Sequence, residues 1–136
     1  MRTDFLVIGS GIAGLFAAVK ASWLNPQASI QIVTKADEAH ESNTKYAQGG
    51  SAVVLDKVSE SIEKHIEDTL LAGDGLCDKE VVQFVVEEGV ERFKELLEMG
   101  VRFEVDGSGN FKLGKEGGHT ANRVAYHKDF TGFEIE

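Results

Sequence analysis

Three glycines near the start of the chain have the spacing that binds the phosphates of a dinucleotide. They are Gly9, Gly11 and Gly14, in the order Gly-x-Gly-x-x-Gly. The first glycine permits a tight turn, the second lets a pyrophosphate approach the backbone, and the third lets a helix pack closely on a strand. The free amides at the helix N-terminus then attract the negative charge. The alternative is a merely glycine-rich turn that binds nothing.

The residues on either side of these glycines favour the nucleotide site, because they predict a βαβ unit. Residues 4–8 form a short apolar run of the kind that makes a buried parallel strand. Residues 15–21 are small and apolar and predict a helix, which Asn25 and Pro26 break. Residues 29–33 alternate and are β-branched, as in a second strand. The complete unit takes about thirty residues, the length that such a unit requires.

The end of the second predicted strand departs from the pattern that binds NAD. An acidic residue normally stands there and binds the ribose, whereas this chain has Thr34 and Lys35, with Asp37 and Glu38 slightly beyond. Lys35 either contacts an adenosine through its backbone and stem or is a solvated strand end. In neither case does it select ordinary NAD.

Two further loops carry paired glycines beside residues that could do chemistry. Residues 40–52 read HESNTKYAQGGSA, and residues 115–120 read KEGGHT. Paired glycines let a bare backbone approach a ligand. By residue type alone, however, Glu116 with two glycines after it is an ordinary turn. His119 could frame a site, and a structural histidine explains it at least as well.

The other elements are predicted from periodicity and capping residues. Residues 52–55 favour a short strand, and residues 59–72 favour an amphipathic helix. A second helix over 79–99 has Asp78 as its N-cap and Gly100 at its end. The acidic residues of both helices are predicted to form solvated faces.

A β-hairpin is predicted after the second helix. Residues 101–105 and 111–113 would form its strands, and residues 106–110 its turn.

The composition excludes several classes of partner. The 136 residues are 42% hydrophobic and 27% charged, as in a soluble globular protein. No apolar run has the length of a membrane span and the N-terminus lacks a signal-peptide layout, so we expect no membrane and a cytoplasmic location. The net charge of −9 argues against nucleic acid. A single cysteine, Cys77, excludes an internal disulfide, and His65 lacks a second ligand at metal-binding spacing, so no metal is expected.

The order of the motifs resembles one flavoprotein superfamily. A strand, GSGIAG, a Thr-Lys turn and the Tyr-Ala-Gln-Gly-Gly stretch of residues 46–50 are similar to fumarate reductases, succinate dehydrogenases and L-aspartate oxidases. The resemblance favours the L-aspartate oxidases and continues through residues 67–73 and Glu-Gly-Gly-His to an Asp-x-Thr-Gly at 129–132. It implies an α/β, Rossmann-like FAD-binding domain with a parallel sheet. Residues 1–136 would be its N-terminal part, truncated before the capping domain, with a helical segment and a β-hairpin.

The resemblance implies FAD as the cofactor. In relatives the Tyr-Ala-Gln-Gly-Gly loop passes along the flavin, where backbone amides face the ring and glycines avoid a collision with ring or substrate. The relatives with covalent FAD commonly have Ser-His-Thr where this chain has Ser42, Asn43 and Thr44, which implies non-covalent FAD. His40 is out of register with that histidine and is interpreted as a surface residue. The residues implied to bind FAD are Gly9, Ser10, Gly11, Ile12, Ala13, Gly14, Lys35, Asn43, Thr44, Lys45, Tyr46, Ala47, Gln48, Gly49 and Gly50.

The resemblance assigns Glu116 to the substrate. L-Aspartate differs from succinate by one ammonium group, so a carboxylate at that spot favours aspartate. Succinate-acting relatives have an uncharged residue at this position. Many relatives have a histidine at the position of Tyr126, whereas in this chain the histidine, His127, comes one residue later. No role is therefore transferred to either residue, and Tyr126 is interpreted as a packing residue.

The implied function is FAD-dependent oxidation of L-aspartate to iminoaspartate, with oxygen or fumarate as the electron acceptor. The product would feed quinolinate and NAD biosynthesis, with quinolinate synthase as a pathway partner. The family's proton-transfer arginine and carboxylate-binding residues lie beyond residue 136, so residues 1–136 alone are expected to bind flavin weakly and to show no turnover. Three alternatives stay open: a fumarate reductase or succinate dehydrogenase flavoprotein subunit, an NAD-linked dehydrogenase, and a non-catalytic dinucleotide-binding module.

Overall fold

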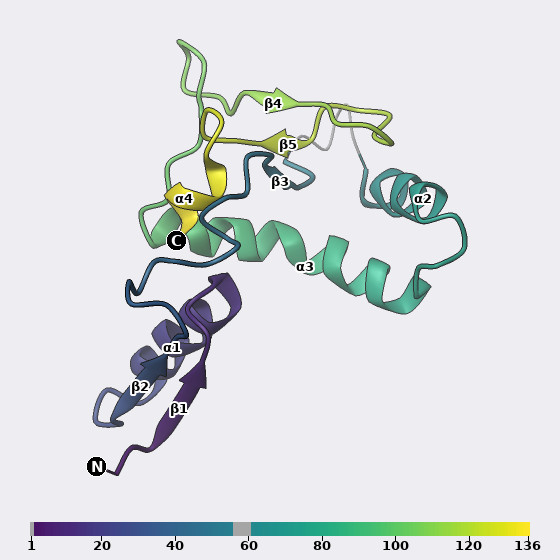
Figure 1. The fold of residues 1–136 in the computed structure, drawn as a ribbon. Coiled ribbons are helices and arrows are strands. Elements are labelled where there is room, and N and C mark those ends of the chain that lie inside the picture. The colour runs from purple at the N-terminus through teal and green to yellow at the C-terminus, as the bar shows by residue number, and fades with distance from the viewer. Residues whose placement is uncertain (1, 56–60) are drawn as a thin grey trace. The chain divides into compact units, whose positions relative to one another are not determined.

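The chain folds into two units, which Figure 1 shows as a ribbon. The computed structural model describes residues 2–55 and 61–136. The first unit comprises Met1–Gln48 and Phe130–Glu136, and the second comprises Gly49–Asp129. The chain passes from the first unit to the second within the Tyr-Ala-Gln-Gly-Gly loop.

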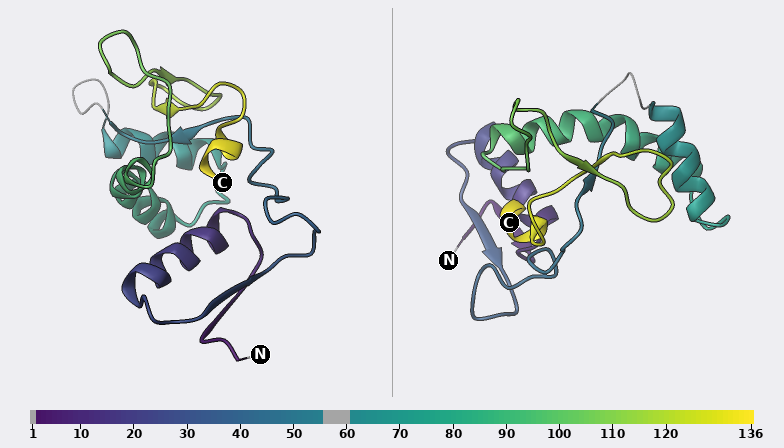
Figure 2. Two further views of the ribbon diagram at one scale, coloured as in Figure 1. Left: turned by 90° about the vertical axis from the view of Figure 1, so that its left-hand side faces the viewer. Right: turned by 90° about the horizontal axis from the view of Figure 1, so that it is seen from above.

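The first unit contains the predicted βαβ arrangement. Its elements are β1 (Phe5–Ile8), α1 (Ile12–Leu24), β2 (Ile30–Val33) and the short α4 (Thr131–Ile135). The two strands pair in parallel, from Phe5 opposite Ile30 to Ile8 opposite Val33, and α1 runs alongside them (Figure 2). Helix α1 is longer than predicted at both ends, and it stops at Asn25 as expected. The parallel βαβ unit is therefore confirmed.

The prediction that residues 4–8 form a buried strand is wrong in one respect. The strand forms and is parallel, but Leu6 and Ile8 are exposed, Ile8 by 84%. The reason is that this sheet has two strands and packs against one helix, so a large part of both strands remains uncovered.

The second unit combines two helices with a small antiparallel sheet. Its elements are β3 (Ser51–Ala52), α2 (Ile62–Ala72), α3 (Lys79–Glu98), β4 (Leu113–Gly114) and β5 (Val124–Ala125). Strand β5 lies between β3 and β4 and pairs antiparallel with both. The core includes Phe93 of α3, whose ring lies 4.6 Å from that of Phe103 and 5.5 Å from that of Phe111 between centroids.

Helix α3 begins and ends where its capping residues predict, whereas α2 begins three residues later than predicted. The Asp78 carboxylate accepts the amides of Glu80 and Val81 at 3.0 and 3.2 Å at the start of α3. Gly100 follows the end of that helix with φ of +100°, a conformation that favours glycine. Helix α2 starts at Ile62 behind the N-cap Ser61, and its predicted first residues, 59 and 60, lie outside the described residues.

Two strand predictions in this unit are corrected. The strand expected over 52–55 is only Ser51–Ala52. The hairpin predicted around residues 106–110 keeps its turn, where the Asp106 carboxylate accepts backbone amides at 2.8 and 3.0 Å. Its strands reduce to one bridge between Val105 and Phe111, because the chain at Leu113–Gly114 pairs with β5 instead.

None of the helices within the described ranges combines the length and hydrophobicity needed to cross a bilayer.

Candidate dinucleotide site and carboxylate loop

The glycine-rich turn joins β1 to α1 in the first unit, and two of its glycines are required by the backbone. Gly9 has φ of +108°, which side-chain-bearing residues rarely adopt. A Cβ on Gly14 would overlap the carbonyl oxygen of Gly9 and lie 3.1 Å from the Val7 side chain. The turn and the close helix–strand packing expected of these two positions are therefore present. At Gly11 the nearest atom to an added Cβ is the Thr44 hydroxyl oxygen at 3.3 Å, so packing makes a weaker demand there.

The start of α1 offers hydrogen-bond donors to an anion. Gly11, its N-cap, has no side chain to accept a backbone amide, and Thr44 Oγ1 accepts the Ile12 amide at 3.1 Å. Ser10 is only 4% exposed, and its hydroxyl has no hydrogen-bond partner among the described residues. Buried hydroxyls normally have a partner, and a phosphate oxygen at this helix N-terminus would supply one. The residues present therefore fit the pyrophosphate of a dinucleotide.

A cavity of about 720 Å³ opens beside this turn. That volume lies within the range of about 300–1,000 Å³ found for ligand pockets. The residues predicted to bind FAD that line it are Gly9, Ser10, Gly11, Lys35, Asn43, Thr44 and Tyr46. A second hollow of about 280 Å³ shares Gly9, Gly11 and Thr44 and is also lined by Ile12, Ala13 and Gly14. The first unit thus brings most of the predicted cofactor residues together.

Lys35 lies at the wall of this cavity, two residues after the end of β2. The carboxyl ends of two parallel strands meet at one edge of a sheet, and ligands of α/β proteins bind outside that edge. The position of Lys35 beside this edge favours the predicted contact with the cofactor over the alternative that it is only a solvent-exposed residue, although its side chain is exposed.

Lys45 and Tyr46 turn toward Glu41, a residue that the sequence did not single out. Lys45 Nζ lies 3.0 Å from one oxygen of the Glu41 carboxylate, and the Tyr46 hydroxyl donates to the other at 2.6 Å. The bond from Tyr46, and then that from Lys45, lowers the pKa of Glu41. The same bonds to Glu41 raise the pKa values of Lys45 and Tyr46. Lys45 is therefore held by Glu41 and does not line the cavity beside the glycine turn.

Ala47 and Gln48 do not line either hollow. The Ala47 carbonyl instead accepts the amide of Gly132 at 2.9 Å. A Cβ on Gly132 would overlap the Thr44 carbonyl oxygen, so this glycine is needed for the close approach of α4 to the loop. The Asp-x-Thr-Gly motif therefore packs against the residues just before the paired glycines.

In the second unit, Glu116 lies in the exposed loop between β4 and β5. The amide of His119 donates to the Glu116 carbonyl oxygen at 3.1 Å, and Gly118 has φ of +87°. A Cβ added at Gly49 would lie 3.9 Å from Glu116 Oε1. The structure thus places the predicted substrate carboxylate beside the paired glycines of residues 49–50.

The two glycines of that pair have different reasons to be glycine. A Cβ on Gly50 would overlap the carbonyl oxygen of Ala125 and lie 2.6 Å from Val124 Cγ1. Packing against β5 therefore explains Gly50 without a ligand. No such overlap limits Gly49: among the described residues, an added Cβ would meet Glu116 Oε1 at 3.9 Å, which is an ordinary van der Waals contact. A flavin contact at either glycine stays a prediction.

Three residues near the Glu116 loop were missed in the sequence. Asp68 of α2 lies 2.7 Å from Arg123 Nη2, and the same carboxylate oxygen accepts the Thr120 amide at 2.7 Å and its hydroxyl at 2.8 Å. Burial opposes the charge of Asp68, but the bonds from Thr120 and Arg123 outweigh it and lower its pKa to about 2. The charge pattern does not distinguish Asp68 from the solvated acids of α2. The one available sign that Asp68 is buried is its position three residues after His65, which places both side chains on the same face of the helix.

Comparison with known proteins decides the family. The family of FAD binding domains matches residues 4–135. The chain belongs to the FAD-binding domain family. FAD is therefore the cofactor of this domain, which disfavours the alternative of an NAD-linked dehydrogenase.

Within this FAD-binding domain family, the chain is similar to L-aspartate oxidases. It is 51% identical over 133 residues to the chloroplastic L-aspartate oxidase of Oryza sativa subsp. japonica, covering 98% of this chain and 20% of that protein. It is 41% identical over 138 residues to the L-aspartate oxidase of Yersinia pestis, covering 98% and 25%. The resemblance inferred from the motifs is confirmed. The chain spans only about a fifth to a quarter of the length of these relatives.

The fold of this FAD-binding chain is also similar to a solved flavoprotein. E. coli quinol fumarate reductase superposes with a TM-score of 0.90 at 32% identity, over 99% of this chain and 23% of that one. The match agrees with the predicted α/β class and with the superfamily named from the motifs.

Proposed function

We propose that this chain is part of an FAD-dependent L-aspartate oxidase that converts L-aspartate to iminoaspartate. The observation that carries the proposal is the Glu116 carboxylate beside Gly49, at the end of the loop that passes along the flavin in similar proteins. A carboxylate there can form a charge-assisted hydrogen bond with the α-ammonium group of aspartate. Residues 1–136 would be the N-terminal part of a Rossmann-like FAD-binding domain.

The residues of this chain would bind and orient, and FAD would supply the redox chemistry. FAD, when bound, would supply the oxidising chemistry by which the Cα–N bond of L-aspartate becomes a C=N bond. Ser10 and the amides of the first turn of α1 that follow Ile12 would hold the pyrophosphate. Glu116 would hold the ammonium group, and the bare backbone at Gly49 would leave room beside it.

The cellular context is proposed on the same resemblance. Oxygen or fumarate would reoxidise the flavin, and iminoaspartate would be passed to quinolinate and NAD biosynthesis, with quinolinate synthase as the partner that consumes it. The cytoplasmic location expected from the sequence stays a prediction.

A fumarate reductase or succinate dehydrogenase flavoprotein subunit is the second candidate function. The likeness to quinol fumarate reductase favours it. The charge of Glu116 argues against it, because succinate and fumarate have no ammonium group to pair with a carboxylate.

Replacing Glu116 tests the substrate assignment. In the full-length protein, Glu116→Gln is expected to raise the KM for L-aspartate about 10- to 100-fold, because a hydrogen bond between charged groups contributes about 1.5–3 kcal/mol. Inhibition by succinate, which lacks the ammonium group, should change little. Steady-state kinetics with both compounds measures this. Glu67→Gln, which neutralises an exposed carboxylate on α2, is the matched control, and an unchanged aspartate KM in Glu116→Gln would reject the assignment.

The flavin is expected to leave the protein when it unfolds. Asn43 lines the large cavity, and its amide cannot form the bond that histidine forms with FAD in the covalent relatives. Acid precipitation of the full-length protein should therefore leave the flavin in the supernatant, measured by absorbance. Flavin that stays with the precipitated protein would show that another residue forms a covalent link.

A further inference from the structure

We propose that Asp68 is a positioning residue for Glu116, which it holds through Thr120 and Arg123, and that this anchor sets the preference for a substrate bearing an ammonium group. The inference rests on the proposed function and extends it from the carboxylate to the helix that places it.

The loop that carries Glu116 needs an anchor outside itself. It leaves the sheet after Gly114 and returns at Arg123, whose amide donates to the Gly114 carbonyl oxygen at 3.0 Å. Between these ends stand Gly117 and Gly118, and glycine is the residue with the greatest backbone freedom. The exposed Glu116 carboxylate would therefore sample many positions if only the strands held the loop.

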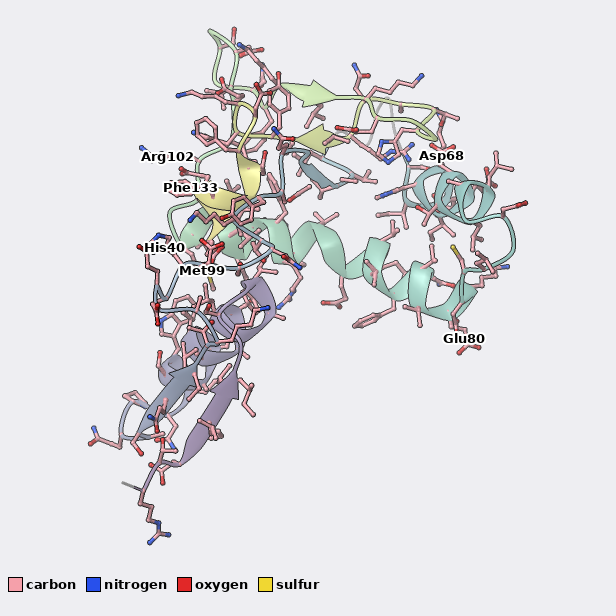
Figure 3. All side chains as sticks on the ribbon, in the orientation of Figure 1. His40, Asp68, Glu80, Met99, Arg102 and Phe133 are labelled. Carbon is pink, nitrogen blue, oxygen red and sulfur yellow. The ribbon has the colours of Figure 1, made fainter. Side chains whose placement is uncertain are left out.

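The anchor is the carboxylate of Asp68. One of its oxygens accepts the amide of Thr120 at 2.7 Å and the hydroxyl of Thr120 at 2.8 Å, and lies 2.7 Å from Arg123 Nη2. Asp68 is 5% exposed and Arg123 is fully buried. Figure 3 shows Asp68 on the side of α2 that faces the loop between β4 and β5. Hydrogen bonds to a charged group are stronger than those between neutral groups, and burial of Asp68 strengthens them further.

One of the residues that α2 contacts is hydrogen-bonded to Glu116 through a short turn of the loop. His119, the neighbour of Thr120, donates its amide to the Glu116 carbonyl oxygen at 3.1 Å, and its ring meets that of His65 edge-on at 6.0 Å between centroids. An added Cβ at Gly118 would lie 3.2 Å from Ala72 Cβ at the end of α2. Helix α2 therefore contacts this loop at three successive residues, 118–120. Glu116 is thus held beside Gly49 by α2 as well as by its own strands.

Removing the Thr120 hydroxyl tests the anchor while leaving every charge in place. In the full-length flavoprotein, Thr120→Val is expected to raise the ratio of the KM for L-aspartate to the inhibition constant of succinate about fivefold. This size lies within the range of couplings between contacting residues. The change in kcat should be smaller. Thr120→Ser keeps the hydroxyl and should restore the ratio. Thr69→Val removes a hydroxyl that donates within α2, to the His65 carbonyl at 2.8 Å, and should leave the ratio unchanged. If Thr120→Val does not retain flavin, Thr120→Ala removes the same hydroxyl without a β-branch.

A double-variant cycle separates positioning from general destabilisation. If the anchor acts through Glu116, adding Thr120→Val to Glu116→Gln should not shift the aspartate-to-succinate ratio further. Two results would overturn this inference and leave the proposed function standing. One is a further fivefold shift of the ratio when Thr120→Val is added to Glu116→Gln. The other is an unchanged ratio in Thr120→Val alone while Glu116→Gln does shift it. If Glu116→Gln alone leaves the ratio unchanged, the substrate role of Glu116 fails and the inference fails with it.

Discussion

Asp68→Ala is expected to lower the free energy of unfolding of the full-length protein by about 3–5 kcal/mol. Arg123, its partner at 2.7 Å, is fully buried, so the substitution would remove a carboxylate that faces a guanidinium charge in the interior. The amide and hydroxyl of Thr120 would lose the same acceptor. Denaturant unfolding followed by circular dichroism measures the change.

The matched control is a neighbouring acid on the same helix. Glu67 is exposed, and Glu67→Ala should change stability by less than about 0.5 kcal/mol, as is usual for surface positions. A loss below about 1 kcal/mol for Asp68→Ala would contradict the account of a buried ion pair.

The same carboxylate gives stability a specific dependence on pH. The pKa of Asp68 is about 2 in the folded protein against an ordinary value of 3.8. Because the folded value is lower, its contribution is complete above about pH 4 and is lost as the pH falls toward 2. By linkage, that contribution is about 2 kcal/mol. Asp68→Asn should therefore lose correspondingly less stability than the parent protein between pH 5 and pH 2.5.

Gly14→Ala is expected to destabilise the first unit by about 3 kcal/mol or more and to deplete the protein of FAD. The added Cβ would overlap the Gly9 carbonyl oxygen, and a backbone atom in a tight turn cannot move away as a flexible side chain can. Overpacking of this kind typically costs about 1–3 kcal/mol, and more where the backbone must shift. Flavin content per purified protein and the unfolding midpoint measure the two effects.

Two other glycines provide the comparison for Gly14. Gly89, inside α3, has no atom within 4 Å of an added Cβ, so Gly89→Ala should be neutral or stabilising by up to about 1 kcal/mol through helix propensity. At Gly11 the added Cβ meets only the Thr44 hydroxyl at 3.3 Å. Gly11→Ala should therefore weaken FAD binding with little effect on unfolding in the absence of FAD. Equal flavin retention in Gly14→Ala and Gly89→Ala would contradict the account of the turn.

Features that depend on neighbouring residues were predictable from the sequence. The N-cap Asp78 and the terminal Gly100 defined α3, and three spaced glycines between a strand and a helix defined the nucleotide turn. Each of these signals lies within a few residues of the element that it specifies. The same is true of the turn at 106–110, which Asp106 closes with its own carboxylate.

Features that depend on distant residues were not predictable. The small sheet is built from two-residue strands, too short to show an alternating pattern, so the pairing of β5 with β3 and β4 left no mark in the sequence. Asp68 lies 52 residues before Thr120, and neither residue carries a local sign of the other. The packing of Gly50 against the Ala125 carbonyl was not predictable either, because these two residues are also far apart in the chain.

We propose that this FAD-binding chain belongs to an enzyme that oxidises L-aspartate. The most direct test records the visible flavin spectrum of the full-length protein under anaerobic conditions during addition of L-aspartate and, separately, of succinate. Aspartate is expected to bleach the visible absorption band of the oxidised flavin, and succinate is expected to leave it unchanged. Bleaching by succinate alone would contradict this proposal and would place the protein among the dicarboxylate oxidoreductases.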